Sequence, residues 1–335
     1  MRLFFVHIPK TAGTSFRLGL EKYLGRKKLP IFSRFFGRTN VYYDYGAENE
    51  ETTSVVTEMV HQEDPDVWAL SKKMREEDVS LFCGHVSAQR YVSILGSRNT
   101  VTFVRRPVDR LISEYRHFVR HYEYQGDLST FYSLPKKTNV IHNYLQSVPL
   151  ESLGFIGITE RYNESVELFN HRYNMSIPLL HKNYGDDELL HRVSSEDVAE
   201  IERLNQKDIM LYAQCCELFE TRLQLYHEGL PFAHARLTCA TTKQISGWAW
   251  WSLMKADAPV DIEIWLNGER AQVVRATHFR PDLCCLNPPR GGYVGFHLKG
   301  VFSPEDRVQC RVAETGQWFP ASPQTLIVPK LGVRN

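Results

Sequence analysis

The sequence predicts an α/β fold, a P-loop-like parallel sheet flanked by helices, followed by a C-terminal all-β sandwich domain. Short apolar runs suited to buried strands alternate with helical patterns over the first 230 residues. From about residue 236 the pattern changes to strand alternation with frequent turn signals, which is typical of a small sandwich. The length of 335 residues fits about two domains at ~150 residues each, so we expect domains over 1–230 and 235–330.

The first domain opens with a strand, a small-residue loop and a helix. Leu3–Ile8 is a short apolar run, and the apolar residues of Phe16–Leu24 recur at helical spacing. Pro107 favours a helix start, because its missing N–H would be unpaired there anyway. In chain order, the other elements expected are helices over 52–60 and 67–75, strands over 80–83 and 100–104, a helix over 108–122, a strand over 155–158, and helical pattern over 164–173 and about 194–227.

The second domain shows its clearest signal in one hairpin. Val260–Leu266 alternates apolar and polar residues and ends at Asn267-Gly268, the strongest short hairpin signal. Further short strands are expected over 273–276, 295–298 and 308–312. The residues from Ala235 onward are net basic, whereas those before it are slightly acidic.

Composition argues against several function classes. The net charge is +1, without the basic excess of a protein whose main partner is nucleic acid, so any anion site must be local. The seven cysteines form no CxxC pair, which leaves a zinc site without support and indicates a reducing compartment. The apolar runs are too short for a signal-peptide core or a membrane span, so we expect a cytoplasmic protein.

The loop over residues 10–15 has the composition of a phosphate cradle. Gly13 permits close backbone approach, and a following helix N-terminus presents unpaired N–H groups that attract an oxyanion. Lys10 adds a full charge, and hydroxyls are added by Thr11, Thr14 and Ser15. The lysine comes first and no glycine precedes it, unlike a Walker A loop, which disfavours a P-loop kinase. An ordinary polar turn is the alternative.

A second basic element follows a later strand. Arg105 stands at the carboxyl end of the strand expected over 100–104, where open α/β sheets bind ligands. Ser113 follows eight residues later, about two helical turns on. A guanidinium and a hydroxyl together can clamp a phosphate group. The alternative is a solvated, basic helix start.

These two elements together resemble the sulfotransferases that use 3′-phosphoadenosine 5′-phosphosulfate (PAPS). In that family a K-T-x-G-T-S loop binds the 5′-phosphosulfate and an R-x-P-x-x-R-x-x-S segment binds the 3′-phosphate. The string over 7–15 is similar to the H-I-P-K-T-G-G-T-S of Golgi-type carbohydrate sulfotransferases and their bacterial relatives. The resemblance covers about residues 1–230, with further likenesses at 43–46, 82–86, 113–117 and 157–162.

The resemblance implies a PAPS-dependent carbohydrate sulfotransferase. PAPS would be the co-substrate, no metal would be needed, and the acceptor would be a hydroxyl of a polysaccharide, oligosaccharide or glycolipid. A homodimer and membrane association through a glycolipid acceptor stay open. Golgi enzymes carry an N-terminal anchor, whereas this chain starts at its first strand, which favours a bacterial, cytoplasmic enzyme. The alternatives are a catalytically inactive protein of the same fold that binds nucleotide or polysaccharide, and a P-loop kinase.

Three positions depart from the family pattern. Arg106 stands where Asp is frequent, and its charge either strengthens phosphate binding or faces solvent. Ala12 replaces a frequent Gly, which should be tolerated if the φ of this residue is negative. The stretch 139–143 stands where relatives carry an Asn-x-Gln-x-Arg string, so its contribution to the site is in question.

Lys10 and His85 are the expected catalytic residues. By analogy with phosphoryl transfer, Lys10 neutralises charge on the leaving phosphate oxygen, and backbone N–H groups of residues 12–15 hold the 5′-phosphate. His85 is the expected base, in the Gly-His-Val string where related glycan enzymes are expected to place a histidine. A structural role is the alternative for His85 and the favoured one for His7 beneath the loop. For Glu160 a structural or substrate-positioning role is favoured over a role as base.

Two further side-chain sets have open roles. Arg110 either reaches phosphate or pairs with Glu114 at i+4, while His117 and His121 lack the partners of a zinc motif. In the second domain, the strings at 247–249, 279–282 and 295–296 are similar to small β-sandwich modules appended to bacterial polysaccharide-assembly proteins. A sugar platform or an aromatic core would be formed there by Trp248, Trp250, Trp251 and Trp265.

Overall fold

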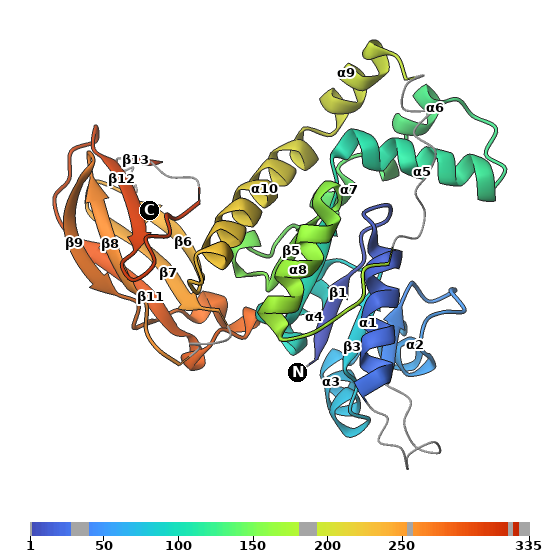
Figure 1. Ribbon diagram of the computed structural model, residues 1–335, viewed down its shortest axis with the longest axis horizontal. Coiled ribbons are helices and arrows are strands. Elements are labelled where there is room, and N and C mark those ends of the chain that lie inside the picture. Colours follow the sequence, from blue (N-terminus) through green and yellow to red (C-terminus); the bar gives the residue numbers. More distant parts are fainter. Residues whose placement is uncertain (1, 28–39, 181–192, 253–256, 321–323, 328–335) are drawn as a thin grey trace, which may run out of the picture. The chain divides into compact units, whose positions relative to one another are not determined.

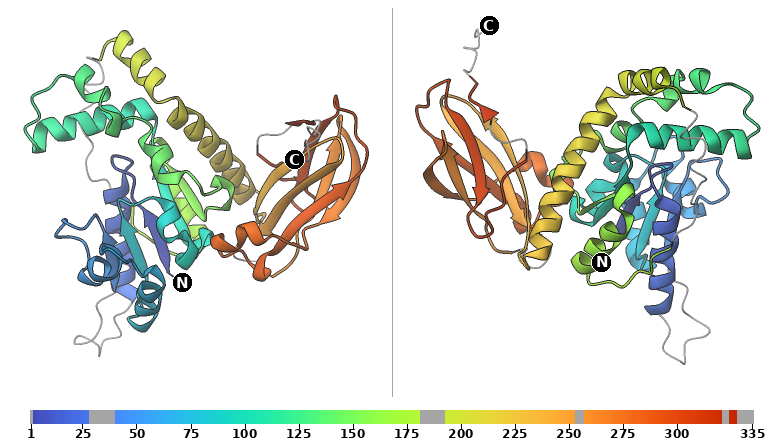
Figure 2. Two further views of the ribbon diagram at one scale, coloured as in Figure 1. Left: turned by 180° about the vertical axis from the view of Figure 1, so that it is seen from behind. Right: turned by 45° about the horizontal axis from the view of Figure 1, so that its top comes forward.

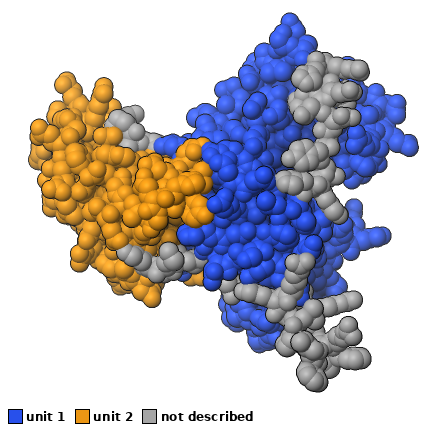
Figure 3. Space-filling view, in the orientation of Figure 1, with its two compact units in different colours: residues 1–219 blue, residues 220–335 orange. Residues whose placement is uncertain are grey.

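The computed structural model describes residues 2–27, 40–180, 193–252, 257–320 and 324–327. The chain divides into two compact units, residues 1–219 and 220–335 (Figure 3). The boundary falls within α10 (Gln206–His227). Each unit has its own sheet system, so each is described by itself.

The first unit is built on a five-stranded parallel sheet of order β2-β3-β1-β4-β5, flanked by helices (Figures 1 and 2). This confirms the α/β class. In chain order the strands are β1 (Leu3–Val6), β2 (Val41–Asp44), β3 (Leu81–Gly84), β4 (Thr100–Val104) and β5 (Phe155–Ile158). All residues of β1, β3, β4 and β5 are buried, as expected for a parallel sheet covered on both faces.

Helices connect these strands. They are α1 (Gly13–Lys27), α2 (Ser54–Val60), α3 (Val67–Glu76), α4 (Ala88–Leu95), α5 (Pro107–His121), α6 (Leu128–Tyr132), α7 (Val140–Leu145), α8 (Tyr162–Tyr173) and α9 (Ser195–Leu204), followed by α10. Pro107 is the first residue of α5, as predicted. The strand order places β1 between β3 and β4, so the segments that follow these three strands are neighbours at one edge of the sheet.

The sequence pattern of this unit missed the strand β2, the short helices α4, α6 and α7, and a break between two helices. β2 is a four-residue edge strand whose residues alternate between half-buried and buried, a pattern too short to detect. The helical pattern expected from 194 to 227 is two helices, because Asn205 interrupts it. The Asn205 side-chain amide donates to Ile201 O at 2.8 Å, and its Oδ1 accepts from Asn139 N at 2.8 Å.

The second unit contains two four-stranded antiparallel sheets, β10-β11-β7-β6 and β13-β12-β8-β9. The strands are β6 (Ala233–Ala240), β7 (Gln244–Trp251), β8 (Asp261–Leu266), β9 (Glu269–Arg275), β10 (His278–Phe279), β11 (Tyr293–Lys299), β12 (Arg307–Val312) and β13 (Gln324–Thr325). Residues of both sheets share one apolar core, which confirms the sandwich. The β8–β9 hairpin turns at Asn267 and Gly268, both at positive φ, as the sequence predicts.

Most of the tryptophans of this unit are buried. Trp251 belongs to the sandwich core, while Trp250 points to the other face of β7 and stacks on Trp248 with ring centroids 4.4 Å apart. All three are at most 2% exposed, so of the two alternatives the buried aromatic packing, and not the sugar platform, holds for them. Of the four candidates, only Trp265 keeps an intermediate exposure.

Candidate active site at the carboxyl edge of the parallel sheet

The anion loop runs from the end of β1 into the first turn of α1. The Thr11 hydroxyl donates to Ile8 O at 2.9 Å and closes the loop on itself, and Phe16 N–H bonds back to Ala12 O at 3.2 Å. The N–H groups before Phe16 belong to the first turn, which lacks intrahelical acceptors and carries no acidic residue. The loop therefore presents donors and a partial positive charge, the requirements of an oxyanion site.

The loop adopts a left-handed backbone at two positions that are not glycine. Lys10 has φ 68° and Ala12 has φ 62°. The condition under which Ala12 would replace Gly without cost, a negative φ, is therefore not met. A left-handed conformation costs a residue with a Cβ roughly 1–2 kcal/mol. Strain of this kind is characteristic of functional loops.

Gly13 is required by its contact with His7. A Cβ built on Gly13 would overlap the His7 imidazole. His7 lies at the end of β1, is 7% exposed, and stacks on Phe5 with ring centroids 5.4 Å apart. Burial first, and then the neighbouring His85, hold the pKa of His7 well below its usual range, so its ring is neutral. As expected, His7 packs beneath the loop.

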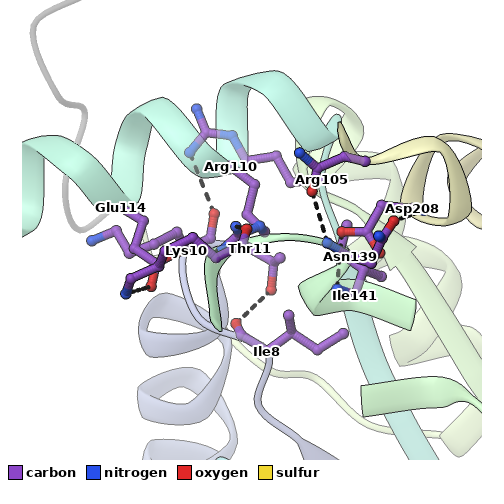
Figure 4. A network of polar contacts seen from close by, with 11 residues as sticks. Ile8, Lys10, Thr11, Arg105, Arg110, Glu114, Asn139, Ile141 and Asp208 are labelled. Carbon is purple, nitrogen blue, oxygen red and sulfur yellow. Dashed lines mark hydrogen bonds and ion pairs between the residues drawn. The ribbon is translucent and has the colours of Figure 1, made fainter. Parts of the chain in front are cut away.

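Two cations meet at the loop. The Arg105 guanidinium, at the end of β4, lies 3.4 Å from Lys10 O, and Figure 4 shows both residues beside the loop. Burial, and then the charge of Arg105, lower the pKa of Lys10. Among the described residues, the Lys10 ammonium has no hydrogen-bond or ion-pair partner. Two positive charges therefore lie close together at the loop, and a bound anion would neutralise them.

The open question about Arg110 is settled by a buried ion-pair group. Arg110 is 1% exposed, and its Nη1 lies 2.7 Å from Glu114 Oε2 (Figure 4). Lys137 Nζ lies 2.6 Å from Glu114 Oε1. Burial alone would raise the pKa of Glu114, but these two cations lower it, so the carboxylate is charged. Arg110 therefore pairs with Glu114, and Ser113 between them lies half-buried on α5.

Glu160, at the end of β5, fixes the start of α5. Its Oε1 accepts the Arg106 N–H at 2.8 Å, and its Oε2 accepts the Tyr212 hydroxyl at 3.0 Å. This is the structural role that the sequence favoured. The Arg106 side chain is 63% exposed and lies 3.5 Å from Asp109, so it faces solvent.

His85 follows β3 on the other side of the loop from Arg105. Its Nδ1 lies 2.6 Å from His7 O. A carbonyl oxygen can only accept, so Nδ1 carries the proton and the lone pair of the neutral ring is on Nε2. The residue keeps exposed surface, yet burial lowers its pKa, although the hydrogen bond to His7 opposes the shift. His85 is thus a neutral imidazole with a fixed tautomer at physiological pH.

Sequence reasoning missed the side chains supplied by the end of β2. Tyr45 packs edge-to-face on His85 with ring centroids 4.8 Å apart, and its hydroxyl lies 3.6 Å from Cys83 Sγ. Asp44 is buried and accepts from Tyr91 OH, while His61 Nε2 lies 2.7 Å from its other oxygen. The string at 43–46 was a likeness to the family, but because β2 was not predicted, these residues could not be placed beside His85.

The remaining candidates lie on α5 and at the start of α7. The rings of His117 and His121 lie 4.6 Å apart, and no group of three potential metal ligands occurs among the residues that the structure describes. Asn139 ties two helix starts together, since its Oδ1 accepts from Lys207 N at 3.1 Å and Asp208 N at 3.3 Å. This stretch therefore supports the starts of α7 and α10.

A parallel sheet with an anion loop after its first strand defines a class of α/β enzymes that bind phosphate groups. The model of the sulfotransferase family matches residues 1–176, more than half of the chain, and the chain belongs to that family. The matched residues include the loop, His85 and Arg105, and they leave the sandwich outside.

Two further comparisons add little. The crystal structure of a sulfotransferase from Alicyclobacillus acidocaldarius is 16% identical, and the match covers 61% of this chain and 95% of that chain. Its TM-score is 0.28, too low to support an argument. No curated protein matches the chain. Across the described residues, no helix is long and apolar enough to cross a membrane.

Proposed function

We propose that this sulfotransferase transfers the sulfuryl group of PAPS to a hydroxyl of a carbohydrate acceptor. One observation supports this most strongly: the anion loop after β1 has Arg105 on its β4 side and the free Nε2 of His85 on its β3 side. A donor bound in the loop would thus have a cation on one side and a base on the other.

The donor would be held by the loop and by α5. Backbone N–H groups of residues 12–15 would bind the 5′-phosphosulfate, with hydroxyls from Thr14 and Ser15, while the bond from Thr11 to Ile8 keeps the loop closed. Arg105 and Ser113 would bind the 3′-phosphate. The buried Arg110–Glu114 pair supports α5, on which Ser113 lies.

The reaction would be an in-line displacement at sulfur. His85 Nε2 accepts the hydroxyl proton as the acceptor oxygen forms its bond to sulfur, and the bond from sulfur to the bridging phosphate oxygen breaks. Lys10 neutralises the charge that develops on that leaving oxygen. A positioned base contributes typically ~10²–10⁴-fold to such a step. No residue of the proposed mechanism requires a metal ion.

A transfer assay tests the proposal. The full chain is incubated with ³⁵S-labelled PAPS and a panel of polysaccharides, oligosaccharides and glycolipids, and label in the glycan is counted. Lys10→Ala should abolish most transfer, whereas Lys299→Ala, the same change at the exposed end of β11, should leave it intact. If no glycan is labelled but the desulfated nucleotide binds, the chain is an inactive binding protein. If ATP replaces PAPS as donor, it is a kinase.

The organisation of the chain extends the proposal. Residues 1–230 would form the PAPS-binding domain and 235–330 an accessory domain. Seven free thiols support a reducing compartment such as the cytoplasm. Size-exclusion chromatography with light scattering tests a homodimer, and flotation with glycolipid vesicles tests membrane association.

A further inference from the structure

The outer face of the sheet β13-β12-β8-β9 carries a stack of aromatic rings and a guanidinium. Arg311 of β12 has its guanidinium carbon 4.8 Å from the Trp265 ring centroid and 5.2 Å from that of Trp318. The two indole rings meet edge-to-face, with centroids 5.7 Å apart. We call these three residues the Trp–Arg stack. Such contacts between a cation and aromatic rings hold each partner in place.

A buried carboxylate fixes the stack from below. Glu263 of β8 is 5% exposed and lies 2.6 Å from Arg311 Nη2 and 3.1 Å from Arg270 Nη1. Its Oε2 also accepts the Trp265 indole N–H at 3.0 Å. Burial alone would raise the pKa of Glu263, but the hydrogen bonds from its neighbours lower it, so it is charged. The face is therefore preorganised before any ligand arrives.

The same face is exposed and carries excess positive charge. Trp318 is 41% exposed, and the side chain of Arg270 is 58% exposed. One carboxylate, Glu263, serves both Arg270 and Arg311, which leaves one positive charge in excess. Arg307, exposed at the start of β12, has no side-chain partner among the described residues. An open indole beside arginines that outnumber their carboxylate partners suits a ligand with flat apolar faces and separate anionic groups.

We propose that this face binds a sulfated polysaccharide, with sulfate groups on Arg270 and Arg307 and a sugar ring on Trp318. Guanidinium groups bind such oxyanions with paired hydrogen bonds, and an indole face accommodates the C–H face of a pyranose. The choice of sulfate as the anion rests on the proposed function. A continuous nucleic-acid backbone fits less well, because carboxylates of Asp261 and Glu263 lie among the arginines.

Binding of dextran sulfate to the full chain, measured by affinity electrophoresis without any donor, tests this inference. Trp318→Ala and the pair Arg270→Gln with Arg307→Gln should each weaken binding, Trp318→Ala by about tenfold, the order expected for one lost stacking contact. The controls are Phe279→Ala, an aromatic residue 49% exposed in the other sheet, and Lys299→Gln. Both controls should bind as the parent chain does. Arg311 is left unchanged, because its loss would strand the buried Glu263.

The outcomes separate the alternatives. Unchanged binding in Trp318→Ala and in the arginine pair would overturn the inference. The Trp–Arg stack would then only stabilise the sheet. Equal affinity for unsulfated dextran would overturn the role of the arginines, and equal affinity for double-stranded DNA would overturn the assignment to glycan. Because no donor is present, loss of binding in these variants is independent of sulfuryl transfer. The chain could fail the transfer assay and still pass this one, or the reverse.

Discussion

Replacing Ala12 by glycine should stabilise the first unit. Ala12 has φ 62°, a left-handed conformation that costs a residue with a Cβ roughly 1–2 kcal/mol. Glycine removes that cost, but it loses more backbone freedom on folding than alanine does, which lowers the gain in stability by roughly 0.5–1 kcal/mol. The net expected gain is therefore about 0.5–1 kcal/mol, or about 1–4 °C in Tm for a unit of this size.

Urea and thermal unfolding of the full chain, followed by circular dichroism, measure this effect. Ala69→Gly is the matched control, since Ala69 lies inside α3 and glycine there should cost about 1 kcal/mol. The two substitutions are chemically identical and should have opposite signs. A loss of stability in Ala12→Gly, of the size seen in the control, would refute the left-handed backbone at this position and the account of the loop built on it.

Three further outcomes follow from the same contacts. Gly13→Ala should weaken binding of the desulfated nucleotide by at least about tenfold in calorimetry, because the added Cβ would overlap the His7 ring and displace the loop. Unchanged affinity would show that the loop tolerates this overlap. Glu114→Gln should lower the free energy of unfolding of the first unit by about 3 kcal/mol in urea, because Arg110 is left buried without its counter-charge. A change below about 1 kcal/mol would contradict the stabilising role of this ion pair. The kcat/KM of sulfuryl transfer should rise with pH through a pKa below the usual range of histidine and then level off, because only neutral His85 accepts a proton and burial lowers its pKa. A rate that falls over this range would remove His85 as the base.

The parts of the site that are local in sequence could be predicted. The strand, loop and helix over residues 3–27 follow from apolar spacing and from the small and hydroxyl residues between them. Arg105 at a strand end follows in the same way. What could not be predicted is the backbone at Ala12, because its left-handed φ is imposed by the path of the whole loop and not by alanine itself.

Contacts between segments far apart in the sequence also could not be predicted from the sequence pattern. The carboxylate of Glu160 accepts from a backbone N–H 54 residues away, and the tautomer of His85 depends on a carbonyl 78 residues away. The end of β2 was missed with its strand, although it supplies Tyr45 beside His85. Tryptophan burial in β7 required the knowledge that both faces of that strand are covered, which alternation alone does not give.

The central claim is that His85 acts as the base for transfer from a donor bound in the loop. The most direct measurement is single-turnover transfer of ³⁵S from PAPS to a glycan substrate by the parent chain and by His85→Ala, with affinity for the desulfated nucleotide measured in parallel. The account predicts a fall in rate of about 10²–10⁴-fold with unchanged nucleotide affinity, and no fall in His278→Ala, an exposed histidine of the sandwich. Full activity in His85→Ala would contradict it.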